Sequence, residues 1–169
     1  MSPDLIEPTE ESASPTSAAD SAAESLTPVK LRTDEVHIWL ANLNDFTPES
    51  LRPLLAADEL ARAARFHFER DRSHFIVARG LLRKLLGSYL ETEAAEVSLD
   101  YGAMGKPTLR TAPGSSLTFN LAHSYGLALY AFSRERAVGV DLEYVRDDVA
   151  AEQLAERFFS KGEVEALKS

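Results

Sequence analysis

The amino-acid sequence predicts a mixed fold of helices and strands behind an N-terminal tail. Residues 71–89 place apolar side chains at helical spacing, which gives one apolar stripe along a long helix. Residues 117–143 hold three short segments in succession with the composition of strands. With 169 residues, of which 44% are hydrophobic and 27% charged, the chain has the composition of a globular domain with a real core.

The start of the chain differs in composition from the rest. Residues 1–28 contain six acidic side chains, no basic ones and four of the eight prolines. Apolar anchors are sparse there, so burial cannot offset the entropy lost on ordering. We predict a disordered, acidic tail rich in Ser, Pro and Ala over residues 1–34. It lacks the pattern of a secretory signal, and no apolar run is long enough to span a bilayer, so we expect a cytoplasmic protein without a membrane partner.

The first ordered elements are predicted in the sequence that follows the tail. Residues 36–40 alternate in the period-2 pattern of a strand. Thr47 as N-cap and Pro48 at the first helical position predict the start of a helix. A second helix is predicted over residues 58–66, and the apolar stripe at 71–89 predicts the longest helix.

The second half of the chain is predicted to consist mainly of strands. The predicted strands cover residues 97–101, 117–121, 127–132 and 138–143, with a loop from Gly102 to Pro107. Residues 151–159 are predicted to be helical. Ser160 and Glu163 then form a capping box at the start of another helix, because each side chain can bond the backbone N–H of the other. That helix is cut short at Ser169, which suggests a fragment.

Charge and cysteine content exclude several classes of function. The net charge is −9, but outside residues 1–28 the chain holds 21 acidic and 18 basic side chains, so the folded part is nearly neutral. This balance gives no reason to expect nucleic-acid binding. The chain has no cysteine, which excludes disulfides and leaves only His and carboxylates for a zinc site.

An acidic pair is the sharpest local signal. Asp141 and Glu143 lie two residues apart on a predicted strand, so both carboxylates point to one face while Val140 and Leu142 point to the other. A divalent cation resolves the repulsion between two such carboxylates, and oxygen ligands suit Mg²⁺. By spacing alone, an amphipathic edge strand with a wet acidic face explains the pair equally well.

Three further features carry candidate chemistry. His123 follows a predicted strand, where it could donate to a phosphate or act as an acid or base, unless it is an ordinary turn histidine. Gly105, Lys106 and Pro107 form a loop with a mobile cation. A basic cluster could hold phosphate or form a solvated helix face; it comprises Arg62, Arg65, Arg70, Arg72, Arg79, Arg83 and Lys84. His67 and His74, which lie among these arginines, are interpreted as packing or surface residues.

Four motifs in order resemble a known enzyme family. They are Gly-Lys-Pro at 105–107, Phe-Asn-Leu-Ala-His-Ser at 119–124, Gly-Val-Asp-Leu-Glu at 139–143 and Arg-Phe-Phe-Ser-x-x-Glu at 157–163. Together they resemble the motifs of the surfactin-synthetase-activating 4'-phosphopantetheinyl transferases, and residues 65–80 resemble the heterocyst-type branch. The resemblance implies an α+β fold of two similar halves. The first half would cover residues 35–145, and the start of the second would cover 146–169.

The same resemblance implies roles for individual residues. Asp141, Glu143 and Glu163 match Mg²⁺ ligands, and His123 matches a histidine that contacts phosphate. The remaining matches are the loop Gly105, Lys106 and Pro107 against the adenine, and Arg62, Arg65 and Arg79 around the nucleotide phosphates. Two departures stand out: Ala122 replaces a serine that is frequent in the family, and the family's later Trp-x-x-Lys-Glu-Ala motif is absent.

The implied reaction moves the 4'-phosphopantetheine group of coenzyme A to a serine of an apo acyl or peptidyl carrier protein and releases 3',5'-ADP. Such carriers serve fatty acid, polyketide, peptide and lysine pathways, and we expect the chain alone to be inactive. One alternative is a non-catalytic fragment that binds coenzyme A, a nucleotide or a partner. Another is a metal-dependent phosphoesterase acting on nucleic acid, against which the near-neutral charge argues.

Overall fold

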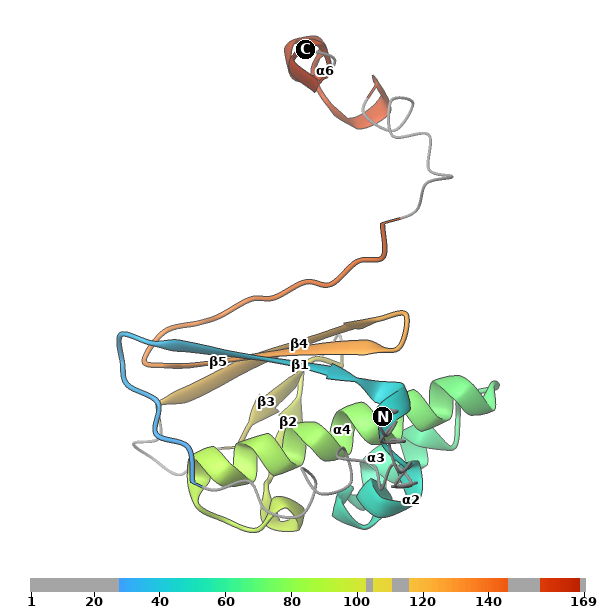
Figure 1. Ribbon diagram of the computed structural model, residues 1–169, viewed down its shortest axis with the longest axis vertical. Helices are drawn as coiled ribbons and strands as arrows, with labels where there is room; N and C mark the ends of the chain where they lie inside the picture. The colour runs from blue at the N-terminus through green and yellow to red at the C-terminus, as the bar shows by residue number, and fades with distance from the viewer. Residues whose placement is uncertain (1–27, 103–104, 111–115, 146–155, 168–169) are drawn as a thin grey trace, which may run out of the picture.

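A computed structural model describes residues 28–102, 105–110, 116–145 and 156–167 of the chain (Figure 1). Within these ranges lie four α-helices described over their whole length, three 3₁₀ turns and five strands. In chain order they are β1 (Val36–Asn42), η1 (Leu43–Asp45), α2 (Pro48–Leu51), η2 (Arg52–Leu54), α3 (Ala57–Ala63), α4 (Glu69–Leu90), η3 (Ala94–Glu96), β2 (Leu99–Tyr101), β3 (Pro107–Leu109), β4 (Leu117–Ser124), β5 (Leu127–Arg134) and α6 (Lys161–Leu167).

The main sheet is antiparallel, with the strand order β1-β5-β4. Strands β4 and β5 form a hairpin whose two turn residues, Tyr125 and Gly126, have φ angles of 48° and 82°. Positive φ at both central residues matches the twist of a two-residue hairpin, and glycine adopts it without strain. β1 pairs along the other side of β5, so that Asn42 lies opposite Leu127 beside this turn.

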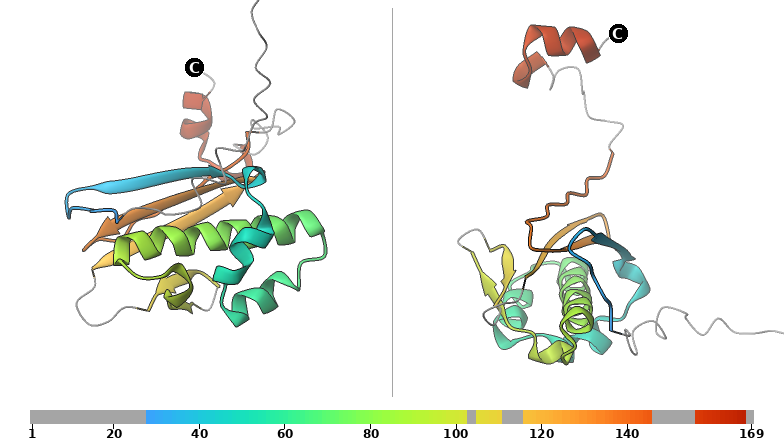
Figure 2. Two further views of the ribbon diagram at one scale, coloured as in Figure 1. Left: turned by 60° about the horizontal axis from the view of Figure 1, so that its bottom comes forward. Right: turned by 90° about the vertical axis from the view of Figure 1, so that its left-hand side faces the viewer.

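Helix α4 packs across one face of the main sheet, and the core lies between them (Figures 1 and 2). Leu82 and Leu86 of the helix are fully buried with Tyr130 and Phe132 of β5. Gly80 lets α2 approach α4 closely, because a Cβ at this position would lie 2.6 Å from Leu51 Cβ. The apolar stripe therefore predicts α4 correctly, and the helix extends slightly beyond residues 71–89 at both ends.

The other face of the main sheet is apolar and open at β1. Val36, Ile38 and Leu40 point outward, with Ile38 53% and Leu40 64% exposed. The inward positions carry His37 and Trp39, whose ring nitrogens each lie 2.8 Å from the Tyr89 hydroxyl on α4. The predicted alternation is confirmed, and the aliphatic side chains lie on the side of the sheet away from the helix.

Several predicted boundaries shift in the structure. The first helix begins at Pro48 as predicted, but Thr47 makes no side-chain capping bond and donates to Ser50 Oγ instead. The second helix, α3, ends at Ala63 rather than residue 66. The loop predicted up to Pro107 connects a β2–β3 hairpin, in which Pro107 already pairs with Tyr101.

The strand predicted at residues 138–143 is wrong. The segment is extended, but the described residues offer no neighbouring strand to complete its hydrogen-bond ladder. It runs along the side of the main sheet away from α4 (Figure 1), tied by a bond of 3.4 Å from Asn120 Nδ2 to the Val138 carbonyl.

The predicted C-terminal elements are confirmed where they are described. Of the helix predicted at 151–159, residues 156–158 are helical and 151–155 lie outside the described residues. The Ser160–Glu163 capping box is present at the start of α6. Residues 1–27 of the predicted tail lie outside the described residues. The assignment of residues 28–34 to a disordered tail is wrong, because Leu31 is 6% exposed in the core and the Val29 N–H donates to the Ser88 carbonyl over 3.1 Å. Among the described helices, none is both long and apolar enough to cross a membrane.

Candidate functional site

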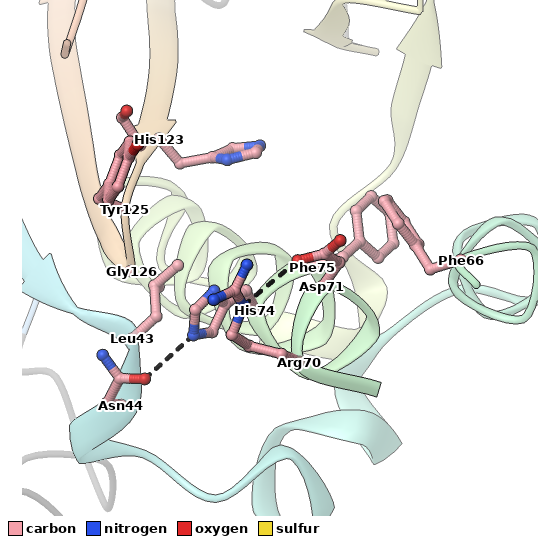
Figure 3. A pocket seen from close by; sticks show the side chains of 11 residues that line it. Leu43, Asn44, Phe66, Arg70, Asp71, His74, Phe75, His123, Tyr125 and Gly126 are labelled. Atoms are coloured by element: carbon pink, nitrogen blue, oxygen red, sulfur yellow. Dashed lines mark hydrogen bonds and ion pairs between the residues drawn. The ribbon is translucent and has the colours of Figure 1, made fainter. Parts of the chain in front are cut away.

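A cavity of about 630 Å³ lies where the start of α4 meets the β4–β5 turn (Figure 3). His74 and Phe75 enter it from α4, and His123 and Tyr125 enter it from the hairpin. Its lining comprises Leu43, Asn44, Phe66, Arg70, Asp71, His74, Phe75, His123, Ser124, Tyr125 and Gly126. The sheet register and the helix packing thus bring the predicted His123 next to the basic part of α4.

His123 is surrounded by positive charge. Partial burial lowers the pKa of its imidazole below the usual 6.5, and the charges of Arg79, His74 and Arg62 lower it further. The imidazole is therefore mainly neutral at pH 7, and its N–H can donate a hydrogen bond to an anion that binds beside it.

The predicted glycine loop and the predicted arginines meet at a second cavity. This cavity of about 420 Å³ is lined by Arg62, Arg65, Phe66 and Gly105. Arg62 Nη1 donates to the Gly105 carbonyl oxygen over 3.3 Å. Gly105 has a φ of 73°, and a Cβ there would lie 3.2 Å from Arg62 Nη1, so a larger residue would be strained and would crowd the arginine. Lys106, next in the chain, is exposed.

A buried ionic cluster lies behind these cavities. Its centre is Glu59 of α3, which is only 1% exposed. Arg83 Nε donates to Glu59 Oε2 over 2.6 Å, and the Tyr101 hydroxyl donates to Glu59 Oε1 over 2.9 Å. Arg79 Nε lies 3.4 Å from the same Oε1. The alternative of a solvated helix face is therefore wrong for Arg79 and Arg83, which are 5% and 2% exposed.

Arg79 is the least satisfied member of this cluster. Its guanidinium carbon lies 5.4 Å from the Phe75 ring centroid and 5.6 Å from that of Tyr101. Neither its Nε nor its Nη1 has a hydrogen-bond partner among the described residues. Burial is the main cause that lowers the pKa of Arg79 from its ordinary value. Because the cluster holds two guanidinium groups and one carboxylate, it carries excess positive charge in a poorly solvated place.

The acidic pair follows β5 on the extended segment. Asp141 and Glu143 are exposed while Val140 and Leu142 are half-buried, so the carboxylates share one side of the segment. Tyr144 stacks on Tyr125 with a centroid distance of 4.2 Å, which ties the segment to the rim of the larger cavity. The predicted alternation is thus present without a sheet ladder.

Glu163 is not brought into a metal cluster with this pair. Glu163 Oε2 accepts bonds of 2.8 Å from the backbone N–H and from the hydroxyl of Ser160, and these bonds lower the pKa of Glu163. Within the described ranges, no group of three or more His, Asp or Glu side chains is arranged to hold a metal ion. The metal-ligand role of all three carboxylates remains a prediction.

The sequence interpretation missed several residues of this site. His74 was interpreted as packing or surface, yet it lines the larger cavity, where its Nε2 lies 3.0 Å from Asn44 Oδ1 (Figure 3). One signal was available, because Arg70 and His74 lie four residues apart and share a face of the long helix. Glu59 was not singled out either, since nothing in its local sequence distinguishes it from a surface acid.

The sequence of the chain is similar to those of known enzymes. The family model "4'-phosphopantetheinyl transferase, N-terminal" matches residues 39–134. A 4'-phosphopantetheinyl transferase, HetI, of Nostoc sp. is 48% identical over 145 residues, which cover 82% of this chain and 60% of that protein. A putative 4'-phosphopantetheinyl transferase of Synechocystis sp. is 34% identical, with coverages of 78% and 54%.

A solved structure also aligns with part of the chain. It is the Helicobacter pylori holo-[acyl-carrier-protein] synthase in complex with coenzyme A, with a TM-score of 0.44 and 14% identity over 59% of this chain and 99% of that chain. The chain spans 60% or less of the length of the two cyanobacterial relatives.

Proposed function

Because the chain belongs to the 4'-phosphopantetheinyl transferase family, we propose that it serves the transfer of 4'-phosphopantetheine from coenzyme A to a serine of an acyl or peptidyl carrier protein. The observation that carries this proposal is the gathering of Arg62, Arg79 and His123 beside the Gly105 loop. We place the reaction in the cytoplasm. The site is a receptor for a polyanion, and coenzyme A carries both a diphosphate and a 3'-phosphate.

The cationic side chains supply the binding energy for these phosphates. Guanidinium groups donate paired hydrogen bonds to phosphate oxygens, and such charge-assisted bonds are about twice as strong as neutral ones. Nε and Nη1 of the buried Arg79 have no hydrogen-bond partner among the described residues, so a phosphate that reaches them displaces no hydrogen bond and competes only with the ion pair to Glu59. The neutral His123 can donate one hydrogen bond to a phosphate oxygen. The predicted contact of Gly105, Lys106 and Pro107 with the adenine places the base at the smaller cavity.

The acidic pair fits a magnesium ion. Asp141 and Glu143 present adjacent, exposed carboxylate oxygens, which are the ligands that Mg²⁺ prefers, and a bound diphosphate and water would complete the coordination. The predicted third ligand is Glu163. When bound, Mg²⁺ would supply charge neutralisation at the diphosphate.

The residues of this chain then act by position and charge. In the proposed reaction a base takes the proton of the carrier serine hydroxyl, the serine oxygen forms a bond to the phosphorus next to the pantetheine, and the bond from that phosphorus to 3',5'-ADP breaks. Negative charge grows on the leaving 3',5'-ADP, where Arg62, Arg79 and His123 stabilise it. The same residues hold the diphosphate in one orientation, which lowers the entropic part of the barrier.

A second candidate function is binding of coenzyme A without transfer. It needs only the cationic side chains beside the Gly105 loop, and within the described residues Glu163 is not gathered with Asp141 and Glu143 in a metal cluster. In this case the chain binds coenzyme A but gives no modified carrier protein.

One experiment distinguishes the two candidates. The protein is incubated with coenzyme A, MgCl₂ and several apo carrier proteins, and the carriers are weighed by mass spectrometry; binding of coenzyme A is measured separately by calorimetry. Transfer predicts a carrier heavier by one phosphopantetheine group and a loss of this product in Asp141→Asn and Glu143→Gln. Glu135→Gln, an exposed acid outside the site, is the matched control. Binding without a mass gain supports the second candidate, and no binding refutes both.

A further inference from the structure

The carboxylate of Glu59 accepts three hydrogen bonds, two at Oε2 and one at Oε1. Its Oε2 accepts from the Ala56 backbone N–H over 2.9 Å and from Arg83 Nε over 2.6 Å. Its Oε1 accepts from the Tyr101 hydroxyl over 2.9 Å. The contact of Oε1 with Arg79 Nε, at 3.4 Å, is an ion pair without the geometry of a hydrogen bond.

The two arginines of the cluster therefore have different roles. Arg83 bonds Glu59 and also donates from Nη1 to the Val97 carbonyl over 2.8 Å, so it joins α3, α4 and the segment before β2. Arg79 lies one helical turn earlier on α4 and makes no such bonds from Nε or Nη1 among the described residues. A buried guanidinium normally pairs with a carboxylate at hydrogen-bond distance, and an accepting oxygen lies within reach.

Tyr101 gives a reason why Arg79 makes no hydrogen bond to Glu59. Burial is the main cause that raises the pKa of Tyr101 to about 12, so the phenol is protonated and donates to Glu59 Oε1. This donor partly neutralises the oxygen that Arg79 would otherwise bond. The Tyr101 and Phe75 rings both lie against the Arg79 guanidinium and fix its place without using its N–H groups.

We propose that Tyr101 is a positioning residue that keeps the Arg79 guanidinium from hydrogen-bonding to Glu59, so that the N–H groups of Arg79 remain available to a phosphate of the cosubstrate. The inference rests on the proposed function, because it needs a phosphate ligand beside Arg62 and His123. Tyr101 lies in none of the sequence motifs. Its proposed role is to raise the affinity for coenzyme A, and it acts through Arg79 alone.

The test removes only the hydroxyl. Tyr101→Phe keeps the ring against Arg79 and frees Glu59 Oε1, which then accepts a hydrogen bond from Arg79 Nε. We expect the affinity for coenzyme A, measured by calorimetry, to fall about tenfold, the size expected for loss of one charge-assisted bond. In an Arg79→Lys background the same substitution is expected to change the affinity less than twofold, since its effect passes through Arg79.

A remote substitution controls for the loss of a partly buried phenol. Tyr89→Phe removes a hydroxyl that His37 and Trp39 contact, and it lies near the far end of α4. Its affinity for coenzyme A is expected to match that of the unchanged protein. The free energy of unfolding of each variant, from urea denaturation, identifies any variant that is not folded.

A spectroscopic readout tests the rearrangement without a ligand. In ¹⁵N-arginine-labelled protein the Nε–H resonance of Arg79, assigned by its loss in Arg79→Lys, is expected to move downfield in Tyr101→Phe as the bond to Glu59 forms. If the unchanged protein and Tyr101→Phe bind coenzyme A with equal affinity, the inference is overturned but the proposed function stands. The same holds if the Arg79 resonance does not move in Tyr101→Phe. Failure of the unchanged protein to bind coenzyme A overturns the proposed function and the inference with it.

Discussion

Replacing Glu59 with Gln removes one charge from the centre of the buried cluster while keeping the volume of the side chain. The substituted amide still accepts one bond, but it cannot balance the guanidinium groups of Arg79 and Arg83, which are almost fully buried. Removing one partner of a buried ion pair costs about 3–5 kcal/mol, because the other charge stays desolvated and uncompensated. We expect Glu59→Gln to lower the free energy of unfolding by about this amount.

Urea denaturation followed by circular dichroism measures this change. A lower midpoint at an unchanged slope would mean that the folded state has lost stability and that the denatured state is the same. Glu96→Gln is the matched control: Glu96 is exposed, and among the described residues its side chain accepts a bond from Thr92 alone, so a loss below about 0.5 kcal/mol is expected. A loss of less than about 1 kcal/mol in Glu59→Gln would refute the view that this carboxylate compensates two buried cations.

Two further predictions concern the cavity rim. The pKa of His123 is lowered in the folded state, so as pH falls through 6.5 the unfolded chain binds a proton first and the free energy of unfolding declines. Urea denaturation of His123→Gln at the same pH values should show a weaker decline. Equal declines in the two proteins would contradict this prediction. Tyr144→Ala removes the stacking on Tyr125 and should weaken Mg²⁺-dependent binding of coenzyme A several-fold in calorimetry, whereas an unchanged affinity would mean that the stack does not position the acidic segment.

The elements that sequence predicted well are those specified by local patterns. Helix α4 follows from its own apolar stripe, and the capping box at Ser160 follows from two side chains three residues apart. Strand β1 shows the limit of this reasoning: alternation predicts a strand, but only the packing of Trp39 and His37 against Tyr89 decides which side faces the helix. The predicted strand at 138–143 failed because a ladder needs a neighbour, which a local pattern cannot supply.

Site residues were predictable from the sequence only where a residue type suited to phosphate binding also lies in or near a recognised motif. Arg62, Gly105 and His123 were singled out from the sequence, and the structure brings them to neighbouring cavities. The burial of Arg79 and Arg83 was not predictable from a run of charges on a helix. Their partner Glu59 lies 20 or more residues away in the chain, and only the packing of α3 against α4 brings it within reach.

The outward side of β1 has a consequence for how this chain behaves at high concentration. β1 is the outermost strand of the main sheet, so its free backbone groups and its stripe of Val36, Ile38 and Leu40 are presented together. An edge strand with unpaired backbone groups and exposed aliphatic side chains is a template for self-association, and the stripe carries no lysine or proline to block it. Salts that strengthen the hydrophobic effect, such as sulfate, favour association through such a surface, and low temperature weakens this association.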